Sequence, residues 1–254
     1  MWRMDIHVQR LHRQQEVLRA LRKVLPDRDL LWQDESVTPY ECDGLSAYRQ
    51  RPLVVALPET HEAVGAVLKV CHTLGVPVVA RGAGTGLSGG ALPDPMGVTL
   101  SLSRLNRVVH VDPLARTATV ECGVRNLAIS EAAAPHGLYY APDPSSQIAC
   151  TIGGNVAENS GGVHCLKYGL TLHNVLRVRG FTVEGEPVEF GSEALDVPGL
   201  DLMTVLVGSE GMLAVTTEVT VKLVPKPKLA RCIMASFDDI RRAGDAVAAV
   251  IAAG

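Results

Sequence analysis

The sequence predicts an α+β fold of two α/β lobes, a small lobe with a parallel sheet and a larger lobe with a mainly antiparallel sheet. In the first hundred residues, two short apolar runs flank an amphipathic stretch that starts at a Thr and ends at a Gly. That order is typical of a β-α-β unit with parallel strands. From residue 107 onward, β-branched runs face each other across short turns, as in hairpins. We place the lobes at residues 1–106 and 107–224.

Each element of the first lobe has its own signal. Leucines at helical spacing among charges predict a helix that Pro26 terminates. Thr60 is a suitable N-cap, and Gly75 a suitable C-terminal stop, for the next helix. The predicted elements are, in order, a helix at 5–25, a turn-rich connector, a buried strand at 52–58, a helix at 61–74, a buried strand at 76–80, and a third strand at 96–102.

The second lobe begins with a predicted hairpin around Asp112 and Pro113. A second hairpin turns near Glu184 and Gly185, and residues 212–225 alternate as a half-buried strand does. Between the hairpins we expect a short helix at 124–137 and a loop at 141–154. Residues 239–254 have the pattern of a further helix.

Composition narrows the class of protein. The 254 residues carry a formal charge of −3, and the pI is near 6.2, which argues against a nucleic-acid partner. Six cysteines show no metal-ligand spacing, so we expect no metal site and reduced, mostly buried thiols. Apolar runs are too short to cross a membrane, and the N-terminus lacks a secretion signal. We therefore expect a cytoplasmic protein with no transmembrane segment.

The stretch RGAGTGLSGG, residues 81–90, holds five glycines directly after a predicted strand. Gly84, Gly86 and Gly89 match a dinucleotide fingerprint, but the following Ala-Leu-Pro-Asp-Pro cannot continue as the helix that this motif opens. A P-loop would need a terminal Gly-Lys-Ser/Thr, which is absent. A flexible linker would not begin directly at a buried strand. The remaining interpretation is a loop whose bare N–H groups converge on a diphosphate.

Two further motifs accompany this loop, PDPSSQIACTIGGNVAENSGGVHCLKYG at 142–169 and VGSEGMLAVTTEVTVKLVP at 207–225. Taken alone, the stretch TIGGNVAENSGG in the motif at 142–169 could be a short helix with a pair of glycines at each end. In this order, the three motifs resemble FAD-linked oxidoreductases of the vanillyl-alcohol oxidase/p-cresol methylhydroxylase (PCMH) type. More narrowly, the chain is similar to FAD-binding subunits of glycolate oxidase and to D-lactate dehydrogenases. The resemblance covers roughly residues 30–225.

The resemblance implies a PCMH-type FAD-binding domain, with FAD extended between the two lobes. The first motif would surround the diphosphate, the second would line the flavin and its ribityl chain, and the third would close over the adenosine. By motif match, the implied cofactor-binding residues are Arg81, Gly82, Ala83, Gly84, Thr85, Gly86, Ser88, Gly89, Pro142, Asp143, Ser145, Thr151, Gly153, Gly154, Asn155, Ser160, Gly161, Gly162, Glu210, Gly211 and Val215.

The expected reaction is oxidation of a D-2-hydroxy acid, such as glycolate or D-lactate, by hydride transfer to flavin N5. Flavin-dependent alcohol or sugar oxidation remains an alternative. A further alternative is a non-catalytic FAD-binding subunit that works with other glycolate-oxidase-type subunits, including an iron–sulfur protein. Through such partners the protein would be associated with a membrane.

Members of this family with covalently bound FAD carry a histidine where Thr85 stands, so we expect non-covalent FAD. Residues 225–254 would begin a substrate-binding cap domain, most of which we expect to be missing because the chain ends inside a predicted helix. The catalytic groups of the family lie largely in that domain. His164, Lys167 and Tyr168 follow the second motif, whereas His136 and His173 lie beside predicted turns. None of them has a pattern that identifies a catalytic base.

Overall fold

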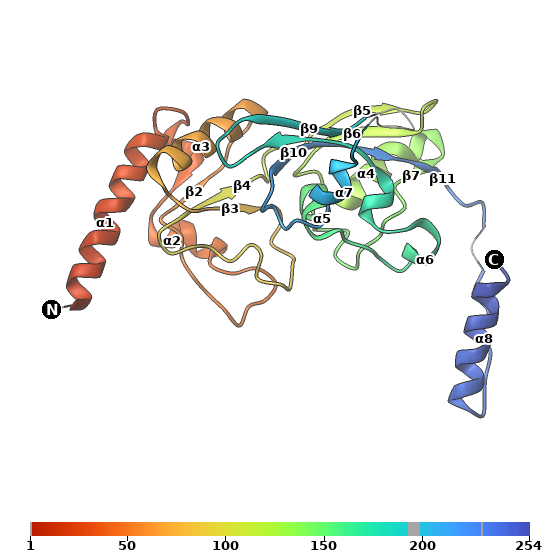
Figure 1. Ribbon diagram of the computed structural model, residues 1–254. Helices are drawn as coiled ribbons and strands as arrows, with labels where there is room; N and C mark the ends of the chain where they lie inside the picture. Colours follow the sequence, from red (N-terminus) through yellow and green to blue (C-terminus); the bar gives the residue numbers. More distant parts are fainter. Residues whose placement is uncertain (1, 193–198, 230) are drawn as a thin grey trace.

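The computed structural model describes residues 2–192, 199–229 and 231–254, and its two larger sheets lie side by side (Figure 1). Its α-helices are α1 (Trp2–Leu21), α2 (Asp34–Val37), α3 (His61–Leu74), α4 (Asn126–Ala133), α5 (Ile152–Glu158), α6 (Cys165–Tyr168), α7 (Leu202–Leu206) and α8 (Ile240–Ala252). Its strands are β1 (Leu30–Leu31), β2 (Val54–Ala56), β3 (Val78–Arg81), β4 (Val98–Ser101), β5 (Val108–Asp112), β6 (Thr117–Glu121), β7 (Leu138–Tyr139), β8 (Val175–Phe181), β9 (Pro187–Gly191), β10 (Val215–Lys222) and β11 (Val224–Pro225).

The first sheet has the strand order β1-β2-β4-β3, and β2, β4 and β3 are parallel. Helix α3 connects β2 to β3, so the predicted β-α-β unit is confirmed. The two-residue strand β1, which the sequence did not predict, adds an antiparallel edge. The expectation that residues 76–80 form a buried strand is wrong, because β3 is the other edge of the sheet and is largely half-buried.

Both ends of α3 are fixed as the sequence predicts. The Thr60 hydroxyl accepts a hydrogen bond from the Ala63 N–H at 3.2 Å. Gly75 adopts a left-handed conformation with φ of 60°, and its N–H bonds to the carbonyls of the last helical turn. These two signals define the helix boundaries because they satisfy backbone groups that the helix itself leaves free.

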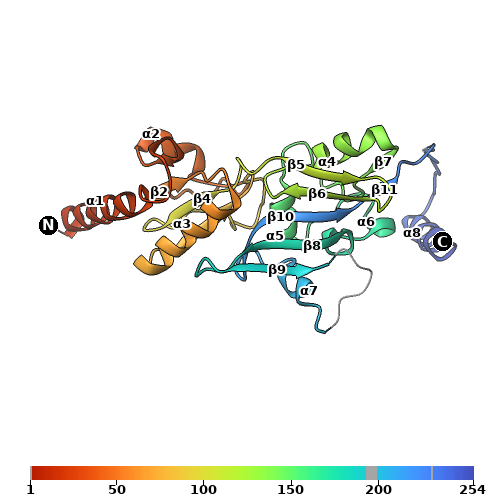
Figure 2. The same ribbon diagram turned by 90° about the horizontal axis from the view of Figure 1, so that it is seen from above.

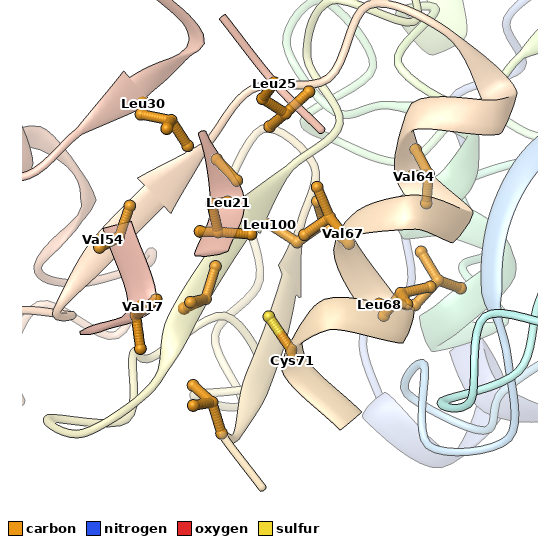
Figure 3. Packing of buried hydrophobic residues seen from close by; sticks show 14 of the residues in the cluster. Val17, Leu21, Leu25, Leu30, Val54, Val64, Val67, Leu68, Cys71 and Leu100 are labelled. Carbon is orange, nitrogen blue, oxygen red and sulfur yellow. The ribbon is translucent and has the colours of Figure 1, made fainter. Parts of the chain in front are cut away.

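The core of the first lobe lies between the helices and the sheet. Figure 3 shows Val17 and Leu21 of α1 and Val67 of α3 in one cluster with the strand residues Val54 and Leu100. All five side chains are fully buried or nearly so. The apolar faces of two helices therefore cover one small sheet.

The second sheet has the order β5-β6-β10-β8-β9, and all of its neighbours are antiparallel. Both predicted hairpins are confirmed as the pairs β5–β6 and β8–β9. Strand β10 joins them in the middle. The expectation of a half-buried strand here is wrong, since nearly every residue of β10 is buried. A middle strand has neighbours on both sides, and α5 packs on one of its faces.

The two lobes pack against each other. Phe181 and Val215 of the second sheet belong to the core cluster of the first lobe. A Cβ on Gly65 of α3 would lie only 2.6 Å from Cε1 of Phe181, so this helix approaches the second sheet closely. The sheets thus divide between β4 and β5, whereas the core continues across that point. Figure 2 shows the lobes forming one elongated body.

The C-terminal residues leave this body. Strand β11 pairs with β7, and α8, the predicted last helix, stands apart at the end opposite α1 (Figures 1 and 2). All six cysteines are free thiols, and three of them, Cys71, Cys122 and Cys150, are buried. Half of the six thiols are therefore buried, so the expectation of mostly buried thiols is wrong. Within the described residues, the structure has no helix long and apolar enough to span a membrane.

A histidine at the contact between the lobes predicts a pH dependence of stability. His61 Nδ1 lies 2.5 Å from Oγ1 of Thr217, and its ring packs on Phe181 with centroids 4.4 Å apart. Burial, followed by the charge of Arg179, lowers the pKa of His61 from 6.5. Below about pH 6.5 the unfolded chain therefore binds a proton more readily than the folded protein does, and stability falls.

We expect His61→Gln to reduce the fall in melting temperature between pH 7.5 and 5.5, measured by differential scanning fluorimetry. His136→Gln, at an exposed turn after α4, is the matched control and should leave the pH profile unchanged. A profile in His61→Gln as steep as that of the wild type would contradict this assignment.

Candidate functional site

A cavity of about 340 Å³ lies where the two lobes meet. Its wall combines the end of β3 and the glycine loop with the segment around α5 and the turn that leads into β10. Figure 1 shows the loop after β3 on the same side of the strands as α5. The three motifs, far apart in the sequence, therefore line one space.

Most of the residues predicted from the motifs line this cavity. They are Arg81, Gly82, Ala83, Gly84, Thr85, Gly86, Thr151, Gly153, Gly154, Asn155, Ser160, Glu210, Gly211 and Val215.

The glycine loop has the conformation that the motif context predicts. Residues 82–97 contain no helix, in agreement with the rejection of a dinucleotide fingerprint. Gly84 and Gly89 have φ of 69° and 81°, a backbone region that favours glycine. A Cβ on Gly82 would overlap Oγ1 of Thr151 across the cavity wall. The loop thus needs glycine partly for its own path and partly for the close approach of α5.

Arg81 supports this loop from behind. Its side chain is buried, and Nη1 donates to the Cys42 carbonyl at 2.8 Å and to the Ala91 carbonyl at 3.4 Å. The guanidinium also lies over the ring of Tyr40, 5.6 Å from its centroid. Burial lowers the pKa of Arg81, and the charge of Asp43 acts in the opposite direction. The arginine therefore places a cation beneath the loop and joins its two ends.

Helix α5 brings the second motif to the cavity. Gly153 packs against Cys122, since a Cβ there would lie 2.8 Å from the Cβ of that residue. Asn155 Nδ2 donates to Oδ1 of Asn126 at 2.8 Å, and Asn126 Nδ2 donates to the Pro142 carbonyl at 2.9 Å. This buried chain of amides holds α5, α4 and the 142 loop together. The Thr151 hydroxyl is buried and has no hydrogen-bond partner among the described residues.

The third motif closes the end of α5. The N–H groups of Gly208 and Glu210 donate to the carbonyls of Val156 and Ala157, both at 2.8 Å. Glu210 has a φ of 54° and Gly211 a φ of 76°. Left-handed backbone is unfavourable for a residue with a side chain, so the two hydrogen bonds hold Glu210 in a strained turn at the cavity wall.

The other predicted residues lie outside the cavity lining, and their assignment to the cofactor stays a prediction. Ser88 Oγ donates to Glu158 Oε1 at 3.3 Å, and Gly89 forms the turn beside it. The rest lie where the 142–145 and 160–164 loops meet, namely Pro142, Asp143, Ser145, Gly161 and Gly162. A Cβ on Gly162 would overlap Asp143, which shows how closely these loops pack.

The side chains without an assigned role are also placed. His164 Nδ1 lies 2.6 Å from Oδ2 of Asp143, and His164 is exposed. The Lys167 ammonium lies over the ring of Tyr168, 5.4 Å from its centroid. His136 is exposed, and His173 accepts a hydrogen bond from the Leu170 N–H. Among the described residues, no cluster of three or more His, Cys, Asp or Glu could hold a metal.

Sequence reasoning missed the connector before β2. Gly44 lies against the glycine loop, because a Cβ there would be 2.6 Å from the Gly86 carbonyl oxygen and 2.9 Å from that of Thr85. Its neighbour Asp43 lines the cavity. Only the Asp-Gly pair in a turn-rich stretch signalled this segment, and such pairs are common. The other lining residues outside the predicted set, many of them within the motifs, are Ala80, Leu87, Gly90, Ala91, Leu102, Cys122, Ser146, Cys150, Val156, Ala157, Glu158, Leu206, Ser209, Ala214 and Thr216.

The sequence is similar to two glycolate oxidase subunits and a D-lactate dehydrogenase. The chain is 63% identical over 238 residues to glycolate oxidase subunit GlcD of Escherichia coli (strain K12), covering 94% of this chain and 48% of that protein. It is 40% identical over 215 residues to subunit GlcD of Bacillus subtilis (strain 168), covering 84% and 46%. A D-lactate dehydrogenase of Anaerostipes hadrus is 33% identical over 227 residues, covering 89% and 47%. The chain thus spans about half the length of these relatives.

A solved alkyldihydroxyacetonephosphate synthase superposes with a TM-score of 0.75 at 23% identity, covering 84% of this chain and 41% of that one. This likeness supports the predicted fold. The family model of the FAD binding domain matches residues 52–191, a range that includes the first two motifs. Because this match spans more than half of the chain, the protein belongs to the FAD binding domain family, with FAD as its cofactor.

Proposed function

We propose that this chain is the FAD-binding part of a dehydrogenase that oxidises a D-2-hydroxy acid of the glycolate or D-lactate type. The observation that carries the proposal is that three separate motifs line one cavity and present bare glycine to it. Gly86 and Gly154 leave space at the wall that the protein does not fill, because an added Cβ would have no described atom closer than 4.0 Å and 3.5 Å, respectively. The identity to glycolate oxidase and D-lactate dehydrogenase sequences supports the substrate class.

The residues present fit a cofactor that carries a diphosphate and many hydrogen-bonding groups. The glycine loop offers bare backbone N–H groups with the Arg81 cation behind them. The unpartnered Thr151 hydroxyl supplies a further donor. We assign the diphosphate to residues 82–86 and Thr151, and the adenosine end to Glu210 and Gly211. When bound, FAD supplies the acceptor of the substrate hydride.

The flavin end of the cofactor is assigned to the remaining predicted residues of the second motif. Asn155 and Ser160 line the cavity, while the 142–145 and 160–164 loops pack on each other beside them. These two loops are joined through the hydrogen bond between Asp143 and His164. We propose that the ribityl chain passes Asn155 and Ser160 and that the flavin ring lies toward these loops.

A visible spectrum of the purified chain after addition of FAD tests cofactor binding, and turnover is tested with the whole protein that carries this chain. Dye reduction is assayed over a panel of glycolate, both lactate enantiomers, a primary alcohol and glucose. We expect activity with glycolate or D-lactate and none with glucose. Activity confined to the alcohol or the sugar would contradict the proposed substrate class. A chain that retains no flavin absorbance after unbound FAD is removed would contradict the proposed FAD site.

Thr85 leaves no histidine in this loop to attach the flavin, so we propose non-covalent FAD. Precipitation of the holoprotein with trichloroacetic acid is expected to release essentially all of the yellow colour into the supernatant. Flavin fluorescence that stays with the washed pellet would refute this attachment mode.

We further propose that the protein works with partner subunits, including an iron–sulfur protein that receives the electrons. Two of the relatives are described as subunits of glycolate oxidase, which supports this assembly. Such partners would also be the means of holding a protein from the cytoplasm at a membrane. Affinity purification from the native source, followed by an iron assay and cell fractionation, tests the proposal, and recovery of an iron-free single chain would contradict it.

A further inference from the structure

Asp43 is a buried acid that the motifs do not include. It lies in the connector between α2 and β2, lines the cavity, and has 6% of its surface exposed. Its Oδ1 accepts a hydrogen bond from the Leu45 N–H at 2.9 Å. Its Oδ2 is buried, and no described residue donates to it. Burying a carboxylate oxygen without a hydrogen-bond donor costs free energy. A ligand group in the cavity that donates to Oδ2 would remove this cost.

Among the described residues, Arg81 acts on this carboxylate through its charge, and none donates a hydrogen bond to Oδ2. Burial lowers the pKa of Arg81, and the charge of Asp43 partly offsets this effect, so the two groups interact. The Nη1 group of Arg81 nevertheless donates to the carbonyls of Cys42 and Ala91. Arg81 therefore lies close enough to interact with the carboxylate, yet its Nη1 hydrogen bonds go to backbone carbonyls and leave Oδ2 without a described donor.

The position of Asp43 restricts the group that it meets. The next residue, Gly44, packs directly against the carbonyls of Thr85 and Gly86 in the loop that we assign to the diphosphate. The diphosphate only accepts hydrogen bonds and carries negative charge, so a carboxylate is an unfavourable partner for it. The hydrogen-bond donors that flank the diphosphate in FAD are the hydroxyl groups of the ribose on one side and of the ribityl chain on the other.

We propose that Asp43 is a cofactor-binding residue whose Oδ2 accepts a hydrogen bond from a sugar hydroxyl of FAD next to the diphosphate. This inference rests on the proposed FAD site. It adds to that site an acceptor that distinguishes a nucleotide with its hydroxyl groups from one without them. It also gives the connector before β2 a direct role in cofactor recognition.

The test is a cycle between protein and cofactor. FAD binding to wild type, Asp43→Ala and Asp43→Asn is measured by quenching of flavin fluorescence. Two analogues are measured in the same way, one with a deoxyribose in the adenosine and one with a deoxygenated ribityl chain. Asp43→Asn keeps an oxygen for the Leu45 N–H, and a melting curve of each apoprotein confirms that it is folded.

We expect Asp43→Ala to weaken FAD binding roughly 10- to 100-fold, the usual range for losing a hydrogen bond to a charged group. One of the two analogues should bind the wild type about as weakly as FAD binds Asp43→Ala. The affinity of that analogue should fall little further in the variants. Which analogue does so identifies ribose or ribityl as the source of the hydroxyl.

If the variants weaken all three cofactors by the same factor, Asp43 only positions the loop and the proposal is overturned. Variants that bind FAD as well as the wild type does would overturn it too. Failure of the wild type to bind FAD would instead remove the proposed function, so the two failures are distinguishable.

Discussion

Replacing Gly86 by alanine is expected to weaken FAD binding by about 10- to 100-fold and to leave the apoprotein as stable as the wild type. Gly86 does not have a left-handed φ, and the nearest described atom to an added Cβ is Oε1 of Glu158 at 4.0 Å. The fold therefore does not require glycine here. An added methyl group would occupy space that we assign to the diphosphate, and overpacking of this kind costs about 1–3 kcal/mol. Fluorescence titration and differential scanning fluorimetry measure the two effects.

Gly137→Ala is the matched control for this substitution. Gly137 has a φ of 68°, also has open space around its Cα in the described structure, and lies outside the cavity. Alanine in a left-handed conformation costs about 1–2 kcal/mol, so this variant should melt earlier yet bind FAD normally. If Gly86→Ala bound FAD as tightly as Gly137→Ala does, the loop would not be the diphosphate site.

Adjacent glycines of α5 are expected to respond in opposite ways to the same substitution. A Cβ on Gly153 would lie 2.8 Å from Cβ and 3.0 Å from the carbonyl oxygen of Cys122, so alanine should force the helix away from the sheet. We expect Gly153→Ala to lose about 1–3 kcal/mol, which corresponds to a melting temperature lower by roughly 2–10 °C.

Gly154→Ala should instead stabilise the apoprotein by up to about 1 kcal/mol, because alanine favours a helix and the new Cβ meets only Thr151 Oγ1 at 3.5 Å. Its methyl group would face the cavity, and FAD affinity should fall about 10-fold or more. The melting temperatures of both apoproteins and their FAD titrations separate the two roles. Equal destabilisation by both substitutions, with FAD affinity retained in Gly154→Ala, would contradict the assignment.

Local signals predicted much of the fold correctly. Thr60 and Gly75 define α3, and the paired β-branched runs define both hairpins, because caps, turns and alternation act between residues close in sequence. The exposure of β3 and the burial of β10 were misjudged. Whether a strand lies at an edge or in the middle depends on which strands pair with it, and β10 pairs with two strands that are far away in the sequence.

Those residues of the candidate site that lie in the glycine-rich motifs could be predicted from the sequence. Arg81, Thr151 and Glu210 lie at one cavity as the resemblance implied. Asp43 and Cys122 could not be predicted, because neither belongs to a motif. Asp43 reaches the cavity through the packing of Gly44 on the loop, and Cys122 reaches it because α5 lies against the end of β6.

By itself, the sequence determined the local elements, the three glycine-rich motifs and, through them, the family. Only the tertiary structure decided why each glycine is needed. Gly153 has no room for a side chain because it packs against Cys122. Gly86 and Gly154, in contrast, face space that the described chain leaves open. The same residue type serves packing at one position and a ligand at another, and the difference depends on atoms contributed by segments distant in the sequence.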